Sequence, residues 1–376
     1  MKSLYYLFVA FMLYSCGNSA TKTAEESSST ATEAPQQWLT YEGNSDMPSV
    51  VLISGDEEYR SEEALPQLAK ILSTRHGFNC TVLFAQDPEQ PGIINPNYSN
   101  NIPGLDKLQS ADMMIVFLRF RALPDEQMQY IDDYLKTGKP VLGIRTSTHA
   151  FNFRAADFES KFAHYGNFYA GEDEWKEGFG RFILGEKWIS HHGQHRHQST
   201  RGLTAPGAEG HPILNGITEG EIWGPTDVYG VRLPLPGDSQ PIVLGQSINR
   251  AAEYDEDDVL YGMRITDDEV AGVDLDEDED ERYDPNDPMM PVAWTKSYQI
   301  PGGNKGKVFA TTLGASTDLL TEGTRRMMVN AVFWCLDLDV PEKANVDIVG
   351  SYQLTPFAFV DEDYWIKQNR SVSSVE

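Results

Sequence analysis

Residues 139–151 read Lys-Pro-Val-Leu-Gly-Ile-Arg-Thr-Ser-Thr-His-Ala-Phe and join an apolar run to a polar turn. The run Val141–Ile144 is short and uninterrupted, as expected for a strand that is buried on both faces. In enzymes with a nucleophile elbow, the residue directly after such a strand is the Ser or Cys that attacks the substrate. This chain has Arg145 there. The segment therefore predicts an architecture and the position of a cleft, but it does not supply the usual nucleophile.

Strand and helix patterns alternate along the first half of the chain. Short apolar runs predict strands at residues 50–53, 81–84, 113–118 and 141–144. Apolar residues at helical spacing from Leu65 to Leu72 end at Gly77, and a second helix begins at Pro124 and ends at Gly138. This β-α-β-α-β order with short connections predicts an α/β fold, with a doubly wound, mostly parallel sheet flanked by helices.

The second half of the chain is less regular. Apolar runs predict strands at residues 242–245, 292–295 and 308–312, and helical spacing predicts a closing helix over residues 319–336. Roughly 300 ordered residues suit one α/β domain with insertions better than two domains. We assign residues 48–350 to this domain, residues 253–288 to an acidic insertion within it, and residues 351–376 to a C-terminal extension.

The first residues predict export and anchorage. Lys2 precedes an apolar run from Leu4 to Leu13, which is too short to span a bilayer but suits the core of a signal peptide. The next residues, up to Cys16, resemble the lipobox of bacterial lipoproteins, in which the signal is cleaved before a Cys that is then lipidated. An ordinary signal peptide with an incidental Cys is the alternative. We assign residues 1–15 to a lipoprotein signal peptide and residues 16–47, which are largely polar, to a flexible tether. The expected location is the bacterial cell envelope, with the lipid on Cys16 in a membrane and the domain facing the periplasm or the cell exterior.

The charge of the chain excludes one class of partner. A net charge of -27 and a pI near 4.6 argue against nucleic acid, which requires clustered Lys and Arg. Residues 253–287 contain 17 acidic residues but only two basic residues, Arg264 and Arg282. This segment lacks the central Gly and terminal Glu of an EF-hand loop, since Glu279 and Pro285 occupy those positions. We interpret it as a solvated loop, with weak cation binding as the alternative.

The cysteines do not predict a disulfide scaffold. If Cys16 is lipidated, Cys80 and Cys335 remain, one in a predicted strand and one in a predicted helix. We expect both to be buried packing residues, with a single bridge between them as the alternative.

Seven stretches together carry a resemblance to a known family. They are Gly55-Asp-Glu-Glu-Tyr-Arg60, Phe117-Leu-Arg-Phe-Arg-Ala-Leu-Pro124, Gly143-Ile-Arg-Thr-Ser-Thr-His-Ala-Phe151, His191-His-Gly193, Trp223-Gly-Pro-Thr-Asp-Val-Tyr229, Pro291-Val-Ala-Trp294 and Thr312-Leu-Gly-Ala-Ser316. In this order they resemble the ThuA-like (trehalose utilisation) family of the class I glutamine amidotransferase-like superfamily, over residues 48–350. The resemblance implies a flavodoxin-like fold and a role in carbohydrate use. It does not imply glutamine amidotransferase activity, because Arg145 stands where that reaction needs a Cys, and Ser316 lies where the family often has a His.

The carboxyl ends of the predicted parallel strands should form the ligand site. Arginines that meet at this edge favour ligands with carboxylate, phosphate or many hydroxyl groups. The alternative is a structural network in which Arg60, Arg119 and Arg145 pair with Asp56, Glu57 and Glu58. Together with the family motifs, this edge predicts the ligand-binding residues Asp56, Glu57, Arg60, Arg119, Arg121, Trp223, Asp227 and Ser316.

The histidines are the strongest chemical signal. Four of the eight lie in the segment from His191 to His197, where neutral imidazoles at short spacing can bind Zn²⁺ or a similar divalent metal. On a β-hairpin His195 and His197 would face one side, so His191, His195 and His197 are the candidate metal ligands. A solvent-exposed polar hairpin is the alternative.

The candidate catalytic residues are His149, His192 and Arg145. Either histidine can act as a general base, and Arg145 lies at the turn that points into the cleft. A nucleophile pair of Ser147 and His149 is a further alternative, although neighbours on a turn need not meet.

Two functions agree with these features. In the first, an envelope-anchored enzyme binds a sugar or glycoside and processes it by acid-base chemistry. In the second, a noncatalytic sugar-binding module or partner subunit captures the sugar for another protein. The tryptophans Trp188, Trp223 and Trp294 offer stacking faces for sugar rings, with core packing as the alternative.

Anchorage is tested by changing the lipidated residue. Because the lipid is attached to the thiol of Cys16, Cys16→Ser should move the protein from the membrane fraction to the soluble envelope fraction. Fractionation followed by immunoblotting measures this shift. A variant that sediments with membranes as the wild type does would show that Cys16 carries no anchor.

Overall fold

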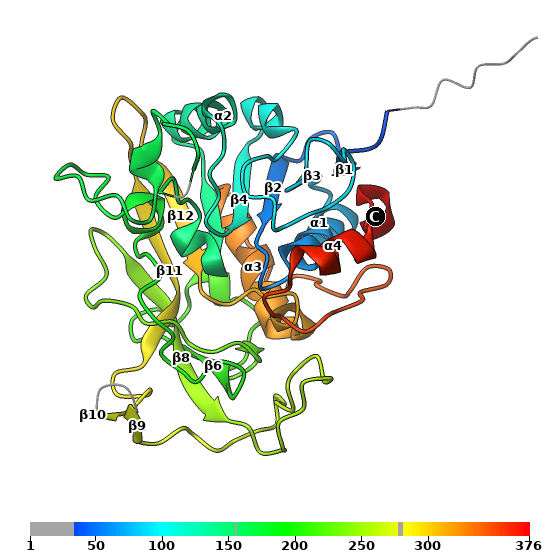
Figure 1. Cartoon of the computed structure of the whole chain (residues 1–376). Coiled ribbons are helices and arrows are strands. Elements are labelled where there is room, and N and C mark those ends of the chain that lie inside the picture. The colour runs from blue at the N-terminus through cyan, green and yellow to red at the C-terminus, as the bar shows by residue number, and fades with distance from the viewer. Residues whose placement is uncertain (1–33, 155, 277–280) are drawn as a thin grey trace, which may run out of the picture. The chain divides into compact units, whose positions relative to one another are not determined.

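The centre of the fold is a set of parallel strands that are apolar on both faces. The computed structural model describes residues 34–154, 156–276 and 281–376. Parallel pairing in the order β3, β2, β4, β5, β12 joins Asn79–Phe84, Ser49–Gly55, Met113–Leu118, Val141–Ile144 and Gly306–Thr311. The strand order reverses between β2 and β4, because β3 lies on one side of β2 and β4 on the other (Figure 1). A ligand site is expected at such a reversal, at the carboxyl ends of the strands.

Antiparallel strands extend this sheet on both sides. Beyond β12 lie β11 (Met290–Tyr298), β8 (Gln240–Asn249), β6 (Gln198–Thr204) and β7 (Trp223–Gly224). At the opposite edge, β1 (Trp38–Tyr41) pairs antiparallel with β3. Two further strands, β9 (Asp274–Asp276) and β10 (Glu281–Tyr283), form a separate pair. The sheet is therefore mixed, and its parallel part combines four strands of the first half of the chain with β12 of the second half.

Helices cover both faces of the sheet. The helices α1 (Ser61–His76) and α3 (Glu322–Cys335) contribute to one hydrophobic core, and α2 (Asp125–Lys136) contributes to the core on the other face. A fourth helix, α4 (Glu362–Gln368), lies in the C-terminal extension. Short 3-10 segments are Leu105–Gln109, Arg145–His149, Ala163–Tyr165, Pro212–Leu214, Asp318–Leu320 and Val372–Val375, and a π-helical turn is Gly180–Leu184. The structure thus confirms an α/β fold with flanking helices.

The strands and helices predicted from apolar periodicity are present, but the expected tether is too long. Residues 38–41 form β1, in which Leu39 is fully buried, so the folded part begins well before residue 48. The polar composition that suggested a tether ends just before Trp38. The signal peptide, Cys16 and tether residues up to 33 lie outside the described residues. Among the described residues, no helix has the length and apolarity required to cross a membrane.

The acidic insertion is attached to the domain more firmly than a solvated loop. Tyr261 and Met263 are buried in the core, and the amide of Asn286 bonds to the backbone of Ser247 through both of its polar atoms. Acidic residues such as Glu253 and Asp255 are exposed, as expected. The expectation of a free loop was therefore wrong for these anchor residues, because apolar and amide side chains are interspersed among the acids.

Both described cysteines are packing residues. Cys80 and Cys335 are free thiols and both are buried. Burial raises the pKa of the Cys335 thiol to about 12 and raises the pKa of Cys80 as well. Neither thiol is therefore a thiolate near neutral pH.

The first turn of α1 contains a buried carboxyl group. Glu62 is fully buried, and neither of its carboxyl oxygens has a hydrogen-bond partner among the described residues. The nearest cation is Arg370, whose Nη1 lies 3.7 Å from Oε1 of Glu62. Burial, followed by the charge of Glu63, raises the pKa of Glu62 from 4.5 to about 7. Ionising this group in place is therefore costly.

The pH dependence of stability should report this group. Because the pKa is raised in the folded state, the contribution of Glu62 is complete below pH 4.5 and is lost as the pH rises through 7. The wild type should therefore lose on the order of 2 kcal/mol more unfolding free energy between pH 5 and pH 8 than Glu62→Gln does. Urea unfolding at several pH values measures the difference. Glu126→Gln, at an exposed position of α2, is the control and should keep the wild-type pH dependence. Parallel pH profiles for wild type and Glu62→Gln would refute the assignment.

Candidate functional site

Three loops at the carboxyl edge of the parallel strands contain strained backbone. Arg60 follows β2 with φ 60°, Phe120 follows β4 with φ 48°, and Arg145 follows β5 with φ 42°. Residues other than glycine rarely adopt this left-handed conformation, which costs on the order of 1–3 kcal/mol. Such strain persists where surrounding contacts hold it, and it concentrates at functional sites. The three loops therefore indicate a site at this edge.

Arg145 is fixed by contacts on every side. Its guanidinium carbon lies 4.0 Å from the ring centre of Tyr59 and 4.2 Å from that of Tyr229, so the cation is held between two aromatic rings. One Nη atom donates to the carbonyl of Thr312 at 2.6 Å, and the other lies 3.3 Å from Oδ1 of Asp227. Arg145 is completely buried. It therefore organises the site from beneath and does not face solvent as a free ligand-binding group.

Asp227, the partner of Arg145, also forms hydrogen bonds with two histidines. Nδ1 of His191 lies 2.7 Å from Oδ2 of Asp227, and Nδ1 of His195 lies 2.9 Å from Oδ1. Burial alone would raise the pKa of Asp227, but the two histidine hydrogen bonds and the charge of Arg145 outweigh it and hold that pKa below its usual value. An ionised carboxylate can only accept, so each Nδ1 carries the hydrogen that it donates. In the neutral ring the lone pair is then on Nε2.

The two histidines reach the surface. The side chain of His191 is 39% exposed and that of His195 is 25% exposed, whereas Asp227 is fully buried. Burial lowers the pKa of His195, with the hydrogen bond to Asp227 acting in the opposite direction. His195 is therefore shifted toward the neutral form, in which Nε2 can accept a proton. The donor atoms of His191, His195 and Asp227 lie within 4.8 Å of one another.

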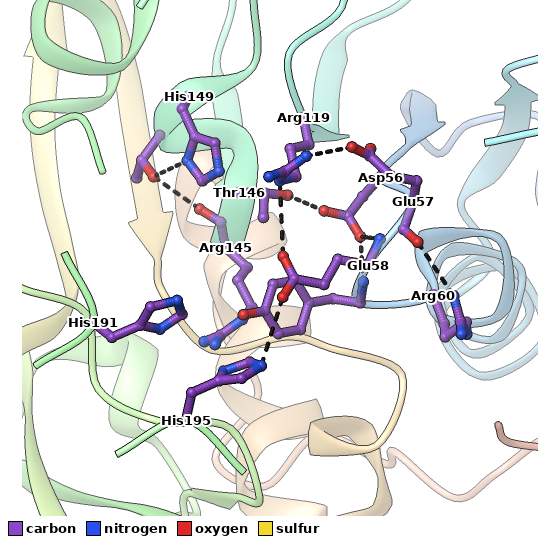
Figure 2. Close-up of polar contacts among 12 residues, drawn as sticks. Asp56, Glu57, Glu58, Arg60, Arg119, Arg145, Thr146, His149, His191 and His195 are labelled. Atoms are coloured by element: carbon purple, nitrogen blue, oxygen red, sulfur yellow. Dashed lines mark hydrogen bonds and ion pairs between the residues drawn. The ribbon is translucent and has the colours of Figure 1, made fainter. Parts of the chain in front are cut away.

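Glu58 completes this group from the β2 side. Its Oε1 lies 3.7 Å from Nε2 of His195, and its Oε2 lies 3.7 Å from Nε of Arg119. Figure 2 shows Glu58 between these two partners, with Arg145 beside it. Burial, followed by the charge of Asp56, raises the pKa of Glu58 to about 7, although Arg119 and Arg145 act in the opposite direction. Glu58 is therefore present in both protonation states near neutral pH, as a general acid or base requires.

The other acidic residues after β2 have structural partners. Glu57 forms ion pairs with Arg119 and with Arg121, the latter at 2.8 Å. Arg121 is buried and also donates to the carbonyl of Pro96 at 2.7 Å. Asp56 accepts a hydrogen bond of 2.5 Å from Thr146. The structural network given as the alternative is therefore present only in part, since Arg119 pairs with Glu57 and Glu58 as that alternative expected. Arg60 donates to Thr355 instead, and Arg145 pairs with Asp227.

His149 lies in a mainly aromatic environment beside this group. Its ring is 4.9 Å from the ring of Phe120 and 5.7 Å from that of Trp188, which in turn is 5.7 Å from His191. Burial, followed by the charges of Arg119 and Arg145, lowers the pKa of His149 well below its usual value. His149 is therefore neutral at pH 7. Trp188 thus contacts both His149 and His191, which belongs with His195 and Asp227 to the cluster called the Asp227 group below.

Ser147 is not a nucleophile. Its hydroxyl donates to the carbonyl of Val116 at 2.6 Å and accepts from the amide of Leu118 at 3.2 Å. These bonds fix the turn against β4 and leave no role for a pair of Ser147 with His149.

Several predicted site residues lie elsewhere. The segment from His191 to His197 is a turn and not a hairpin, so His197 stacks on Tyr254 at 5.3 Å instead of joining His191 and His195. The ring of His192 contacts Tyr283. The turn explains the correction to His197, because a turn does not place alternate residues on the same side.

Three further expected ligand-binding residues serve the fold. Trp223 is buried in the core, where its Nε1 donates to Ser199 at 3.1 Å. Arg60 is buried and donates to Thr355 at 2.9 Å, which ties α1 to the C-terminal extension. Ser316 is fully buried, and its carbonyl accepts from Tyr352 at 2.6 Å. Trp294 is likewise a core residue.

Other members of the group were missed as functional residues. The sequence analysis treated Glu58 as a structural partner and did not assign a role to Tyr59 or Tyr229. The family motifs contain all three, since Glu58 and Tyr59 follow Asp56 and Tyr229 follows Asp227 by two positions. Their presence in the family motifs was the signal that could have identified these residues. The sequence does not reveal which side chains of different motifs come into contact.

The stability of the Arg145 arrangement can be measured. Arg145→Met removes the cation beside the buried carboxylate of Asp227, so we expect a loss of about 3 kcal/mol of unfolding free energy. Urea unfolding at pH 7 measures it. Arg154→Met, at an exposed position, is the matched control and should change stability by less than about 0.5 kcal/mol. Equal losses in both variants would contradict the central position of Arg145.

Comparisons with known proteins give neighbours in structure. No family model matches the sequence, and no curated protein matches it. A protein of Parabacteroides merdae ATCC 43184 described as ThuA-like is 12% identical with a TM-score of 0.43, over 77% of this chain and 90% of that chain. A second protein described as ThuA-like, from Bacteroides uniformis ATCC 8492, is 14% identical with a TM-score of 0.40, over 78% and 93%. The exo-beta-1,4-mannosidase Op5Man5 from Opitutaceae bacterium strain TAV5 is 8% identical with a TM-score of 0.27, over 77% and 36%. The first two descriptions name the family that the sequence motifs resemble.

Proposed function

We propose that this chain is a ThuA-like protein of the bacterial cell envelope that binds a sugar or glycoside and processes it by acid-base chemistry. One observation carries the proposal. The buried carboxylate of Asp227 receives hydrogen bonds from Nδ1 of both His191 and His195, which leaves Nε2 of each ring as the basic atom. Both rings are partly exposed, so a small ligand can reach them.

The chemistry follows from this arrangement. In glycoside hydrolysis, Nε2 of His191 takes a proton from a water molecule as the water oxygen bonds to the anomeric carbon, and the negative charge of Asp227 stabilises the imidazolium that forms. The bond between the anomeric carbon and the leaving oxygen breaks. Glu58, whose pKa is raised to about 7, supplies a proton to the leaving oxygen. The proton lost by one oxygen and the proton gained by the other are thus carried by different residues.

Binding relies on polar groups at the rim. Arg119 is partly exposed and presents a forked donor beside Glu57, which accepts. Adjacent hydroxyl groups of a sugar can donate to the carboxylate and accept from the guanidinium. This combination supports a hydroxyl-rich ligand.

A divalent metal such as Zn²⁺ fits the same group. Two imidazoles and one carboxylate are a donor set used by catalytic zinc, and His191, His195 and Asp227 would hold the ion. The ion would then take the place of the two hydrogens that the imidazoles share with Asp227. A bound ion would supply Lewis-acid polarisation of an oxygen. His197, the third ligand expected from sequence, is not part of this set.

A noncatalytic sugar-binding module or partner subunit is the second candidate. The observation that favours it is the loss of a nucleophile at the elbow, where Arg145 is buried between two rings and the Ser147 hydroxyl is occupied. Glutamine amidotransferase activity is not proposed, because that position needs a reactive thiolate. The envelope location rests on Cys16, and the fractionation experiment described above tests it.

The test compares two histidines of the same turn. The full chain is assayed with trehalose, cellobiose, mannobiose and p-nitrophenyl glycosides, with chromatography for products and calorimetry for affinity. His191→Gln should lower turnover by about 100-fold or more while affinity changes less than about threefold. His197→Gln is the matched control, because His197 lies outside the Asp227 group, and it should behave as the wild type.

Other outcomes separate the candidates. Sugar binding without turnover in the wild type would favour the binding module. Failure of the wild type to bind any of these sugars would reject the carbohydrate proposal. Loss of turnover with EDTA, restored by Zn²⁺, would assign His191 and His195 to a metal, whereas turnover unaffected by EDTA would assign His191 as the base.

A further inference from the structure

The C-terminal extension runs along the carboxyl edge of the sheet. After α3 the chain returns past α1 and ends in α4 and a last 3-10 turn that contacts α1 (Figure 1). The amide of Ala358 donates to the carbonyl of Glu58 at 2.9 Å, which attaches the extension to the loop that carries the candidate acid. The hydroxyl of Tyr352 donates to the carbonyl of Ser316 after β12 at 2.6 Å. The extension therefore contacts two of the loops that form the site.

Phe357 fixes this segment against the histidines. It is completely buried, with its ring 5.4 Å from the ring of Tyr59 and 5.5 Å from the ring of His195. A third ring, that of Tyr261, lies 5.0 Å away. Phe357 thus packs beside the residues that hold Arg145 and Glu58, and it sets the position of the residues that follow.

Phe359, two residues later, has the opposite environment. It is 55% exposed, yet its ring is 4.5 Å from the guanidinium carbon of Arg119. The same guanidinium lies 4.8 Å from the ring of Phe120, which stacks on Phe168 at 5.8 Å. Phe168 is 38% exposed. A partly exposed aromatic ring, that of Phe359, therefore lies beside Arg119, the residue that also pairs with Glu57 and Glu58.

This combination is chemically specific. Single exposed apolar side chains are common on protein surfaces, so the exposure of Phe359 is informative because a guanidinium and a carboxylate lie beside it. A pyranose ring has an apolar face of C–H groups and a polar edge of hydroxyl groups. The phenyl ring of Phe359 suits the face, while Arg119 and Glu57 suit the edge.

We propose that Phe359 forms an aromatic subsite that stacks against a pyranose ring of the ligand. The proposal rests on the proposed function, which it deepens by naming the ring-shaped sugar as the group recognised and the C-terminal extension as part of the binding site. Arg119 and Glu57 bind the hydroxyl groups of that ring, and a neighbouring part of the ligand extends toward Glu58 and His191. Phe359 selects the ligand and takes no part in proton transfer.

The experiment compares two exposed residues of the extension. Phe359→Ala in the full chain should weaken binding of whichever of trehalose, cellobiose and mannobiose the wild type binds by about tenfold or more, as for loss of one stacked ring. Phe359→Trp should restore the affinity. Ile366→Ala is the matched control, because Ile366 is 57% exposed on α4 and should leave affinity unchanged. Thermal unfolding of all three variants verifies that the fold is kept.

Each result has a definite meaning. Wild-type affinity in Phe359→Ala would overturn the aromatic subsite and leave the proposed function standing. Equal losses in Phe359→Ala and Ile366→Ala would also overturn it, since the extension would then act through the fold alone. Failure of the wild type to bind any of the three sugars would overturn the subsite, and failure to bind the p-nitrophenyl glycosides as well would overturn the proposed function with it.

Discussion

The pairing of Arg145 with Asp227 is the constraint on which the rest of the site depends. Both side chains are fully buried, and removing two charges from water costs several kcal/mol per ion unless further partners compensate. The compensation comes from two tyrosine rings and a backbone carbonyl around the arginine, and from two histidines on the carboxylate. The same contacts hold Arg145 at a positive φ. Strand end, turn and histidine loop are therefore one coupled arrangement.

This coupling moves the chemistry away from the elbow. In nucleophile-elbow enzymes the side chain at that turn attacks the substrate. Here it neutralises Asp227, and Asp227 in turn fixes the tautomer of His191 and His195 so that Nε2 of each is basic. The candidate proton-transfer groups, His191 and His195, thus lie on a different loop from the turn that contains Arg145. A fold used elsewhere for nucleophilic catalysis can in this way hold an acid-base or metal-binding group.

How much of this could be predicted depends on the range of the interaction. The strands and helices follow local apolar periodicity, so β2, α1, β4, α2 and β5 were predicted correctly. Arg119 was expected at the carboxyl edge near Glu57 and Glu58, and it pairs with both. Asp227 was expected from a family motif and not from the edge. The partner of the histidines was not foreseen, because Asp227 is 36 residues from His191 and nothing local indicates their hydrogen bond. The positions of His192 and His197 depended on the shape of a turn, which the sequence pattern did not specify.

The balance of charge explains why the extension belongs to the domain. Five acidic residues, Asp56, Glu57, Glu58, Glu62 and Glu63, lie within eight positions at the end of β2 and the start of α1. Their cationic partners come from other elements: Arg119 and Arg121 follow β4, and Arg370 lies in the extension near Glu62 and Glu63. Thr355 of the extension also donates to Glu63 at 2.9 Å. Since buried carboxylates without partners are costly, the acidic segment can adopt its native position only when these distant elements are in place. The extension therefore stabilises the loop that carries Glu58, which links its packing directly to the position of Glu58 beside His195 and Arg119.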